Sequence, residues 1–113
     1  MSFLISIPVP PSCNNLFANR RDGRGRYKTK RYREWITEAG WMAKSQRPQR
    51  VAGKYKFFLS LPPIRGDASN RVKAAEDLIV SLGLVDDDRH CVNAQVAICD
   101  DLNGHAIVAV EAV

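Results

Sequence analysis

Residues 54 to 99 constrain the fold more than any other stretch, because strand-like and helix-like patterns follow one another there. Alternating apolar side chains indicate a strand from Lys54 to Pro62. Residues 70 to 82 carry apolar side chains at helical spacing, and Gly83 marks the end of that helix. Residues 91 to 99 again favour a strand. A strand, helix and strand in succession indicate an α/β domain.

The remaining segments add two strands and one helix to this unit. Residues 2 to 9 alternate as a first strand, and apolar residues at helical spacing predict a helix from Lys30 to Lys44, capped by Thr29. Residues 105 to 113 predict a last strand, which the turn signal Asn103-Gly104 joins to the preceding strand as a hairpin. The expected order is β-α-β-α-β-β, in which both helices pack on one mixed sheet.

Length and composition indicate one globular domain over residues 1 to 113. A chain of 113 residues buries roughly two-thirds of its unfolded surface, which allows a single core. No apolar run is long enough to cross a membrane and no signal segment is recognisable, so we expect a soluble, cytoplasmic protein without a membrane partner. Three cysteines without a CxxC pair argue against a disulfide framework or a zinc site.

Positive charge is concentrated near the N-terminus. Residues 20 to 33 contain eight arginines and lysines but one acid, whereas the whole chain carries a net charge of +5. Glycines interrupt this segment, so we expect a mobile basic loop over about residues 18 to 30. A dense run of one sign interleaved with tyrosines favours contact with nucleic-acid phosphates over a solvated linker, and charge alone leaves DNA and RNA open. The candidate phosphate contacts are Arg20, Arg21, Arg24, Arg26, Lys28, Lys30 and Arg31.

Acidic residues lie on both sides of the predicted helix at residues 70 to 82. Asp67 precedes the helix, and the run Asp86-Asp87-Asp88 follows it. Mg²⁺ needs only one or two protein carboxylates, since it keeps several waters and binds substrate phosphates. We therefore expect the two acidic points to fold back to one metal site. The alternative is that Asp67 caps the helix and the aspartate run is a solvated loop.

Two motifs identify a family that this chain resembles. The first is Asp67-x-x-Asn70-x-x-Lys73-Ala74-Ala75, with Gly83 ending the helix and paired aspartates in the following loop. The second, upstream, is Ile7-Pro8-Val9-Pro10-Pro11-Ser12-x-Asn14-Asn15. Both resemble the RusA-type Holliday-junction resolvases, and the resemblance runs in consistent order over roughly residues 3 to 110.

The resemblance implies a homodimer that resolves four-way DNA junctions with Mg²⁺, or alternatively Mn²⁺, held by three aspartates and assisted by a lysine. By position, the first aspartate falls on Asp67, the lysine on Lys73 and the last aspartate on Asp88. The family's second aspartate falls on Ser69, which has no carboxylate. The site then has one acid fewer, borrows one from the aspartate run, or has weak or no activity. We interpret Ser69 as the helix N-cap.

The sequence therefore predicts a metal-dependent endonuclease acting on branched DNA. Its expected catalytic residues are Asp67, Lys73 and Asp88, with Asp87 as a further metal ligand and Ser69, Asn70 and Asp86 around the metal. One alternative is a nucleic-acid-binding module of the same fold without cleavage activity. Another is a structural or assembly protein. Trp41 lies opposite the apolar stripe of its helix, and a dimer partner, DNA or a neighbouring loop would each cover it.

Overall fold

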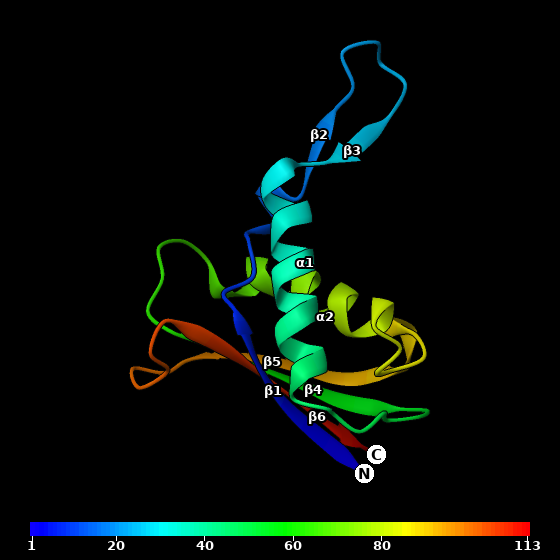
Figure 1. Ribbon diagram of the computed structural model, residues 1–113, viewed down its shortest axis with the longest axis vertical. Coiled ribbons are helices and arrows are strands. Elements are labelled where there is room, and N and C mark those ends of the chain that lie inside the picture. Colours follow the sequence, from blue (N-terminus) through cyan, green and yellow to red (C-terminus); the bar gives the residue numbers. More distant parts are fainter.

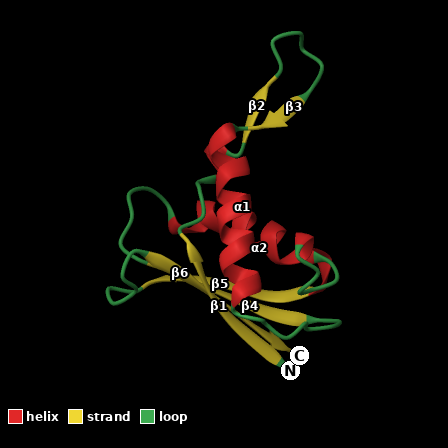
Figure 2. Cartoon of the chain, viewed as in Figure 1, coloured by secondary structure: helices red, strands yellow, loops and turns green.

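The computed structural model describes residues 1–113 as a two-layer α/β domain with a projecting hairpin (Figure 1). Four strands form the main sheet in the order β1-β6-β4-β5, and the two helices pack on one of its faces. Figure 2 shows that these helices, α1 and α2, lie on the same side of the strands. The expected α/β class, with two helices on a mixed sheet, is confirmed.

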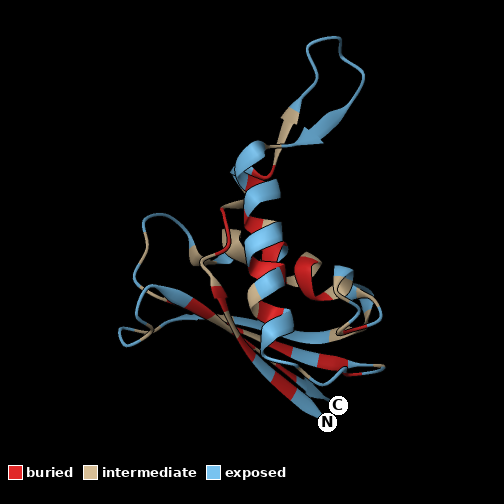
Figure 3. Cartoon of the chain, in the orientation of Figure 1, coloured by how far each residue is buried: buried red, intermediate tan, exposed pale blue.

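The main strands form because apolar residues alternate along them and the helices cover one face. They are β1 (Ser2–Pro8), β4 (Tyr55–Leu61), β5 (Cys91–Ile98) and β6 (His105–Ala112). Phe57 is completely buried in the middle of β4, as are its neighbours at every second position. Strand β6 pairs antiparallel with both β1 and β4, whereas β5 runs parallel to β4 at the edge. Burial is concentrated between the helices and the sheet (Figure 3).

The prediction that the last two strands pair as a hairpin is wrong. Asn103 and Gly104 both have positive φ, 48° and 80°, so the turn itself adopts the left-handed backbone that this pair favours. Strand β6 nevertheless lies between β1 and β4, and β5 pairs only with β4. The physical reason is that β6 buries every second residue in its apolar stretch, which suits a central strand. Strand β5 carries Asn93 and Gln95 and is largely exposed, which suits an edge.

Helix α1 (Lys30–Ser45) begins where its capping residue predicts. The hydroxyl of Thr29 accepts a hydrogen bond from the Tyr32 amide over 3.2 Å, which confirms the expected cap. The helix buries Tyr32, Trp35 and the small residues beneath them against the sheet. Its indole Trp35 Nε1 donates to the carbonyl oxygen of Pro8 over 3.0 Å. This bond ties α1 to the end of β1.

Helix α2 (Val72–Ser81) begins later than expected. A 3₁₀ turn, η2 (Ala68–Arg71), precedes it, and Ser69 lies inside that turn and not at a cap. The N-cap interpretation of Ser69 is therefore wrong. Gly83 has φ +73°, and the Leu84 amide donates to the Ile79 carbonyl over 3.0 Å, so the helix ends at the expected glycine through a left-handed turn.

The expected mobile loop at residues 18 to 30 contains a short β-hairpin. Strands β2 (Phe17–Asn19) and β3 (Arg26–Lys28) pair antiparallel, and Gly23 and Gly25 have positive φ in the turn that joins them. The hairpin extends beyond the start of α1, away from the sheet (Figure 1). The basic side chains are therefore presented on a projection that includes two paired strands. Neither helix has the length and apolar character that a membrane span requires.

Candidate nucleic-acid interface and acidic pocket

The hairpin is anchored to α1 by aromatic and cationic side chains at its base. Phe17 and Tyr32 meet edge to face, with ring centroids 5.9 Å apart. Arg26 lies over the Phe17 ring at 4.9 Å, and Lys28 lies over the Tyr32 ring at 5.8 Å. The hydroxyl of Thr29 also donates to the Asn15 carbonyl over 2.7 Å. These contacts fix the direction in which the hairpin leaves the domain.

The predicted phosphate-binding residues are exposed along this hairpin and the first turn of α1. Lys30 forms an ion pair with Glu34 over 3.7 Å on the helix surface, where water screens it. The other cations of the group have no acidic partner within ion-pair distance. They are Arg20, Arg21, Arg24, Arg26, Lys28 and Arg31. Their charges are available to an anionic ligand.

A pocket of about 360 Å³ lies where the hairpin base meets α2 and the aspartate run. Its charged lining residues are Lys28 from the hairpin, Asp77 from α2, and Asp87 and Asp88 beside the 3₁₀ turn η3 (Asp88–His90). The rest of the wall is mostly apolar and comes from α1, α2 and β2. A cationic arm and a group of carboxylates therefore share one concave surface.

Asp87 and Asp88 are close enough to interact directly. A hydrogen bond with Asp87 raises the pKa of Asp88, and burial and the Asp87 charge raise it further. The amide of Arg89 donates to Asp87 over 3.0 Å, and this bond is the main reason that the pKa of Asp87 is lowered. Two adjacent carboxylates with opposite pKa shifts are an arrangement that a proton or a cation stabilises.

Lys73 projects from the first turn of α2 and pairs with Asp77. Its Nζ lies 3.2 Å from Asp77 Oδ2, and its charge also favours ionisation of Asp88. Lys73 itself does not line the pocket, and its charge acts on Asp88 from the first turn of α2. Asp77 is the carboxylate that sequence reasoning missed. Its position on the polar face of the helix, four residues after Lys73, was the available signal.

The other predicted site residues lie outside this pocket. Asp67 is exposed, its side chain makes no hydrogen bond or ion pair, and it does not line the pocket. Asp86 pairs with Arg50 and accepts a hydrogen bond from the Gly53 amide over 3.3 Å, so it holds the connector before β4. Asn70 Oδ1 accepts a hydrogen bond from Cys13 Sγ over 3.6 Å. Ser69 is exposed within η2.

The two sequence motifs contact each other in space. Besides the Cys13–Asn70 contact, Arg71 Nη1 donates to the Pro10 carbonyl over 2.8 Å. Ser12 accepts a hydrogen bond from the Asn14 amide over 3.3 Å and so caps the 3₁₀ turn η1 (Cys13–Asn15). The upstream motif is therefore a turn that supports the start of α2, and Arg71, which no motif included, connects them.

No group of three or more His, Cys, Asp or Glu side chains is arranged to hold a metal ion. The carboxylates that the pocket offers are the pair Asp87 and Asp88, with Asp77 bound to Lys73. Two acidic ligands fit a hard divalent cation that keeps several waters, so the donor set suits Mg²⁺ better than a fully protein-enclosed metal.

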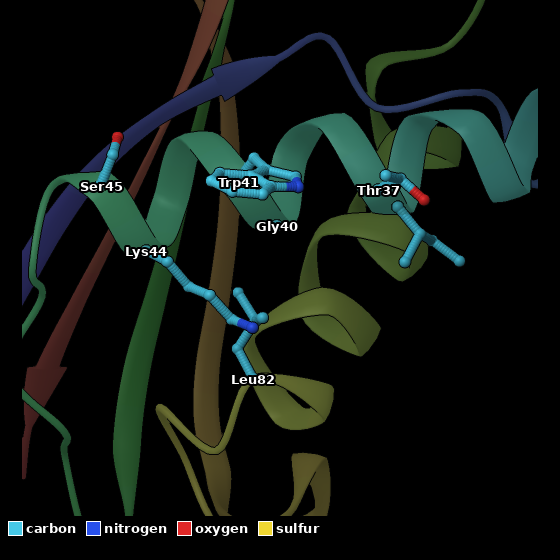
Figure 4. A pocket seen from close by; sticks show the side chains of 7 residues that line it. Thr37, Gly40, Trp41, Lys44, Ser45 and Leu82 are labelled. Atoms are coloured by element: carbon cyan, nitrogen blue, oxygen red, sulfur yellow. The ribbon is translucent and has the colours of Figure 1, made fainter.

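A larger hollow of about 600 Å³ lies between α1 and the end of α2, and none of these acids lines it (Figure 4). Trp41 stands at this hollow with 76% of its surface exposed, as expected from its position on α1. Lys44 is its one charged lining residue and reaches toward Leu82 (Figure 4). No carboxylate, histidine or cysteine lines this hollow.

Comparison of the chain with models of known protein families gives no match, and a search of curated proteins likewise gives none.

Proposed function

We propose that this chain is a Mg²⁺-dependent endodeoxyribonuclease that cuts branched DNA, and four-way junctions in particular. The observation that carries the proposal is the shared pocket, in which Lys28 of the basic hairpin stands opposite Asp87 and Asp88. A DNA strand held by its phosphates along the hairpin would pass directly to the acidic pair. The resemblance of the two motifs to RusA-type resolvases supports the same substrate.

In this proposal Asp87 and Asp88, the two carboxylates side by side in the pocket, hold the metal. Bound Mg²⁺ would polarise the scissile phosphate and lower the pKa of a bound water. Lys73, whose Nζ lies 3.2 Å from Asp77 Oδ2, offsets negative charge that develops on the phosphate oxygens.

The proposed reaction also requires two copies of the chain. Resolution of a four-way junction needs two opposed nicks, and each chain offers one acidic pocket. A two-fold homodimer would present two such pockets to the two strands. DNA is accordingly the proposed ligand, and a second copy is the proposed protein partner.

The test is cleavage of a synthetic four-way junction with and without Mg²⁺. We expect paired nicks in opposed strands that require the metal, and little cleavage of the matching linear duplex. Asp101→Asn is the matched control for Asp88→Asn, because Asp101 is an exposed acid in the turn between β5 and β6. Junction binding without cleavage in either condition would contradict the enzyme and favour a binding module. Neither binding nor cleavage would favour an assembly role.

A further inference from the structure

The two outer edges of the main sheet differ in whether their backbone groups are already satisfied. At the β1 edge, the side-chain amide of Gln46 pairs with the backbone of Ser6. Ser6 N donates to Gln46 Oε1 over 2.7 Å, and Gln46 Nε2 donates to Ser6 O over 2.7 Å. Pro8, the next outward-facing residue, has no N–H. The β1 edge is therefore blocked along its second half and is free only at Ser2 and Leu4.

The β5 edge has no such cover. Cys99 N donates to Leu61 O over 2.8 Å, so odd-numbered residues here turn their backbone groups toward β4. The backbone N–H and C=O groups of successive residues in a strand point to opposite edges. Ala94, Val96 and Ile98 therefore present their N–H and C=O groups outward. Strand β5 pairs with β4 alone, and no side chain bonds to these outward groups. A row of unpaired backbone donors and acceptors results.

The β5 edge also lacks the features that usually prevent strands from pairing. Its eight residues, Cys91 to Ile98, include no charged side chain and no proline. Val92 and Ile98 are 51% and 47% exposed, respectively, which is high for branched apolar residues. The one register shift in the β4–β5 pairing is at Tyr55/Lys56, at the start of β5, so the rest of the edge is regular.

We propose that β5 is the surface through which two copies of this chain associate, antiparallel about a two-fold axis, so that the two sheets become one continuous sheet. Outward N–H groups of one copy would then donate to outward carbonyls of the other, and the exchange is self-complementary by symmetry. The inference rests on the two sheet edges and not on nuclease activity, although it gives the proposed dimer a specific interface.

A second copy fits this edge better than DNA does. Phosphates need cations, and β5 has none, whereas the basic residues are concentrated on the hairpin. Two chains of net charge +5 repel each other least where neither presents charge, as along β5. Because the second half of the opposite edge is blocked by Gln46, pairing through β5 ends at two copies and does not continue into a filament.

The experiment compares molar mass and amide hydrogen exchange in buffer without DNA. We expect light scattering to give the mass of two chains, and the amides of Ala94, Val96 and Ile98 to become protected as protein concentration rises. Ala94→Pro removes an outward N–H without removing a bond to β4, and Ala94→Lys adds charge at an exposed edge position. Both variants should have the mass of one chain at concentrations where the wild type has that of two.

Leu4→Pro is the matched control, because it removes an outward N–H from the β1 edge at a residue that is also exposed. It should leave the mass at two chains. A wild-type monomer at every attainable concentration would overturn the proposal. So would a dimer in which the three β5 amides exchange as fast as unprotected ones, since the interface would then lie elsewhere, as at Trp41. A β5-paired dimer that cuts no DNA would contradict the nuclease proposal alone.

Discussion

At the scale of single residues, Tyr55 shows how a buried polar group is accommodated beside the acidic region. Its ring is completely buried in β4, and its hydroxyl donates to Glu76 Oε2 of α2 over 3.0 Å. Burial raises the pKa of Tyr55 well above its ordinary value of 10.0, and the Glu76 carboxylate adds to the shift. Burial also raises the pKa of Glu76, while the Tyr55 hydrogen bond opposes that rise.

The raised pKa of Tyr55 predicts that the protein loses stability in alkali. Above pH 10.0 the unfolded chain releases the phenol proton, while the folded protein keeps it. The folded state then binds more protons, so the free energy of unfolding falls as the pH rises above that value. We expect Tyr55→Phe to lower stability by about 1 kcal/mol at neutral pH and to lessen the alkaline fall. Urea unfolding across pH measures both, and an alkaline fall as steep as that of the wild type would contradict the assignment.

Ser69 tests where the metal ligands lie. It is exposed in η2, so Ser69→Asp should fold normally, and its carboxylate would stand two residues from Asp67. If Asp67 belongs to the site, the variant should need less Mg²⁺ for half-maximal junction cleavage, while Ser69→Ala should behave like the wild type. An unchanged Mg²⁺ requirement would place the metal with Asp87 and Asp88 alone, and a large loss with alanine would assign the hydroxyl to the metal.

At the scale of elements, Gln46 protects the β1 edge. Its side chain makes two hydrogen bonds to Ser6 and a third to the Met42 carbonyl over 2.8 Å. Gln46→Ala should lower stability by about 1 kcal/mol, because water replaces much of this hydrogen bonding at an exposed position. It should also produce concentration-dependent species larger than two chains, visible by sedimentation velocity. A variant that associates no further than the wild type would show that Gln46 does not block this edge.

Local sequence signals predicted the helices and turns better than they predicted which strands pair with each other. Thr29 sets the start of α1 and Gly83 sets the end of α2 through contacts within a few residues, so both bounds could be predicted from the sequence. The Asn103-Gly104 turn was equally local, but the pairing of β6 with β1 and β4 depends on which strands are apolar enough to be central. Asp77 was not predicted as a site residue, because its closeness to Asp88 depends on how the loop after Gly83 folds back.

The basic hairpin is the element proposed to bind DNA. Replacing Arg24, Arg26 and Lys28 by alanine should weaken binding to all junction sequences about equally, because phosphate contacts carry no sequence information. The dependence of affinity on salt should become shallower by roughly one unit for each phosphate that the variant no longer neutralises. Fluorescence anisotropy over a range of salt concentrations measures this slope. A slope equal to that of the wild type would assign these cations to the solvated surface.

At the scale of the whole molecule, the hairpin is proposed to bind DNA and the carboxylates are proposed to cut it. These two parts meet at one pocket. The hairpin extends from the domain as one arm of a molecule 46 Å long, and the carboxylates lie at its base. Variants of the acidic pocket should therefore reduce cleavage while junction affinity is kept, whereas variants of the hairpin should reduce affinity first. Equal loss of affinity and cleavage in both sets of variants would contradict this division.

The most direct test of the proposed function is junction binding and cleavage by Asp88→Asn, measured side by side with the wild type in Mg²⁺. We expect the variant to bind the four-way junction as tightly as the wild type, because the hairpin is unchanged, and to cut it at least roughly a hundredfold more slowly, since a metal ligand is removed. Cleavage by Asp88→Asn at the wild-type rate would contradict the assignment of the acidic pocket as the catalytic site.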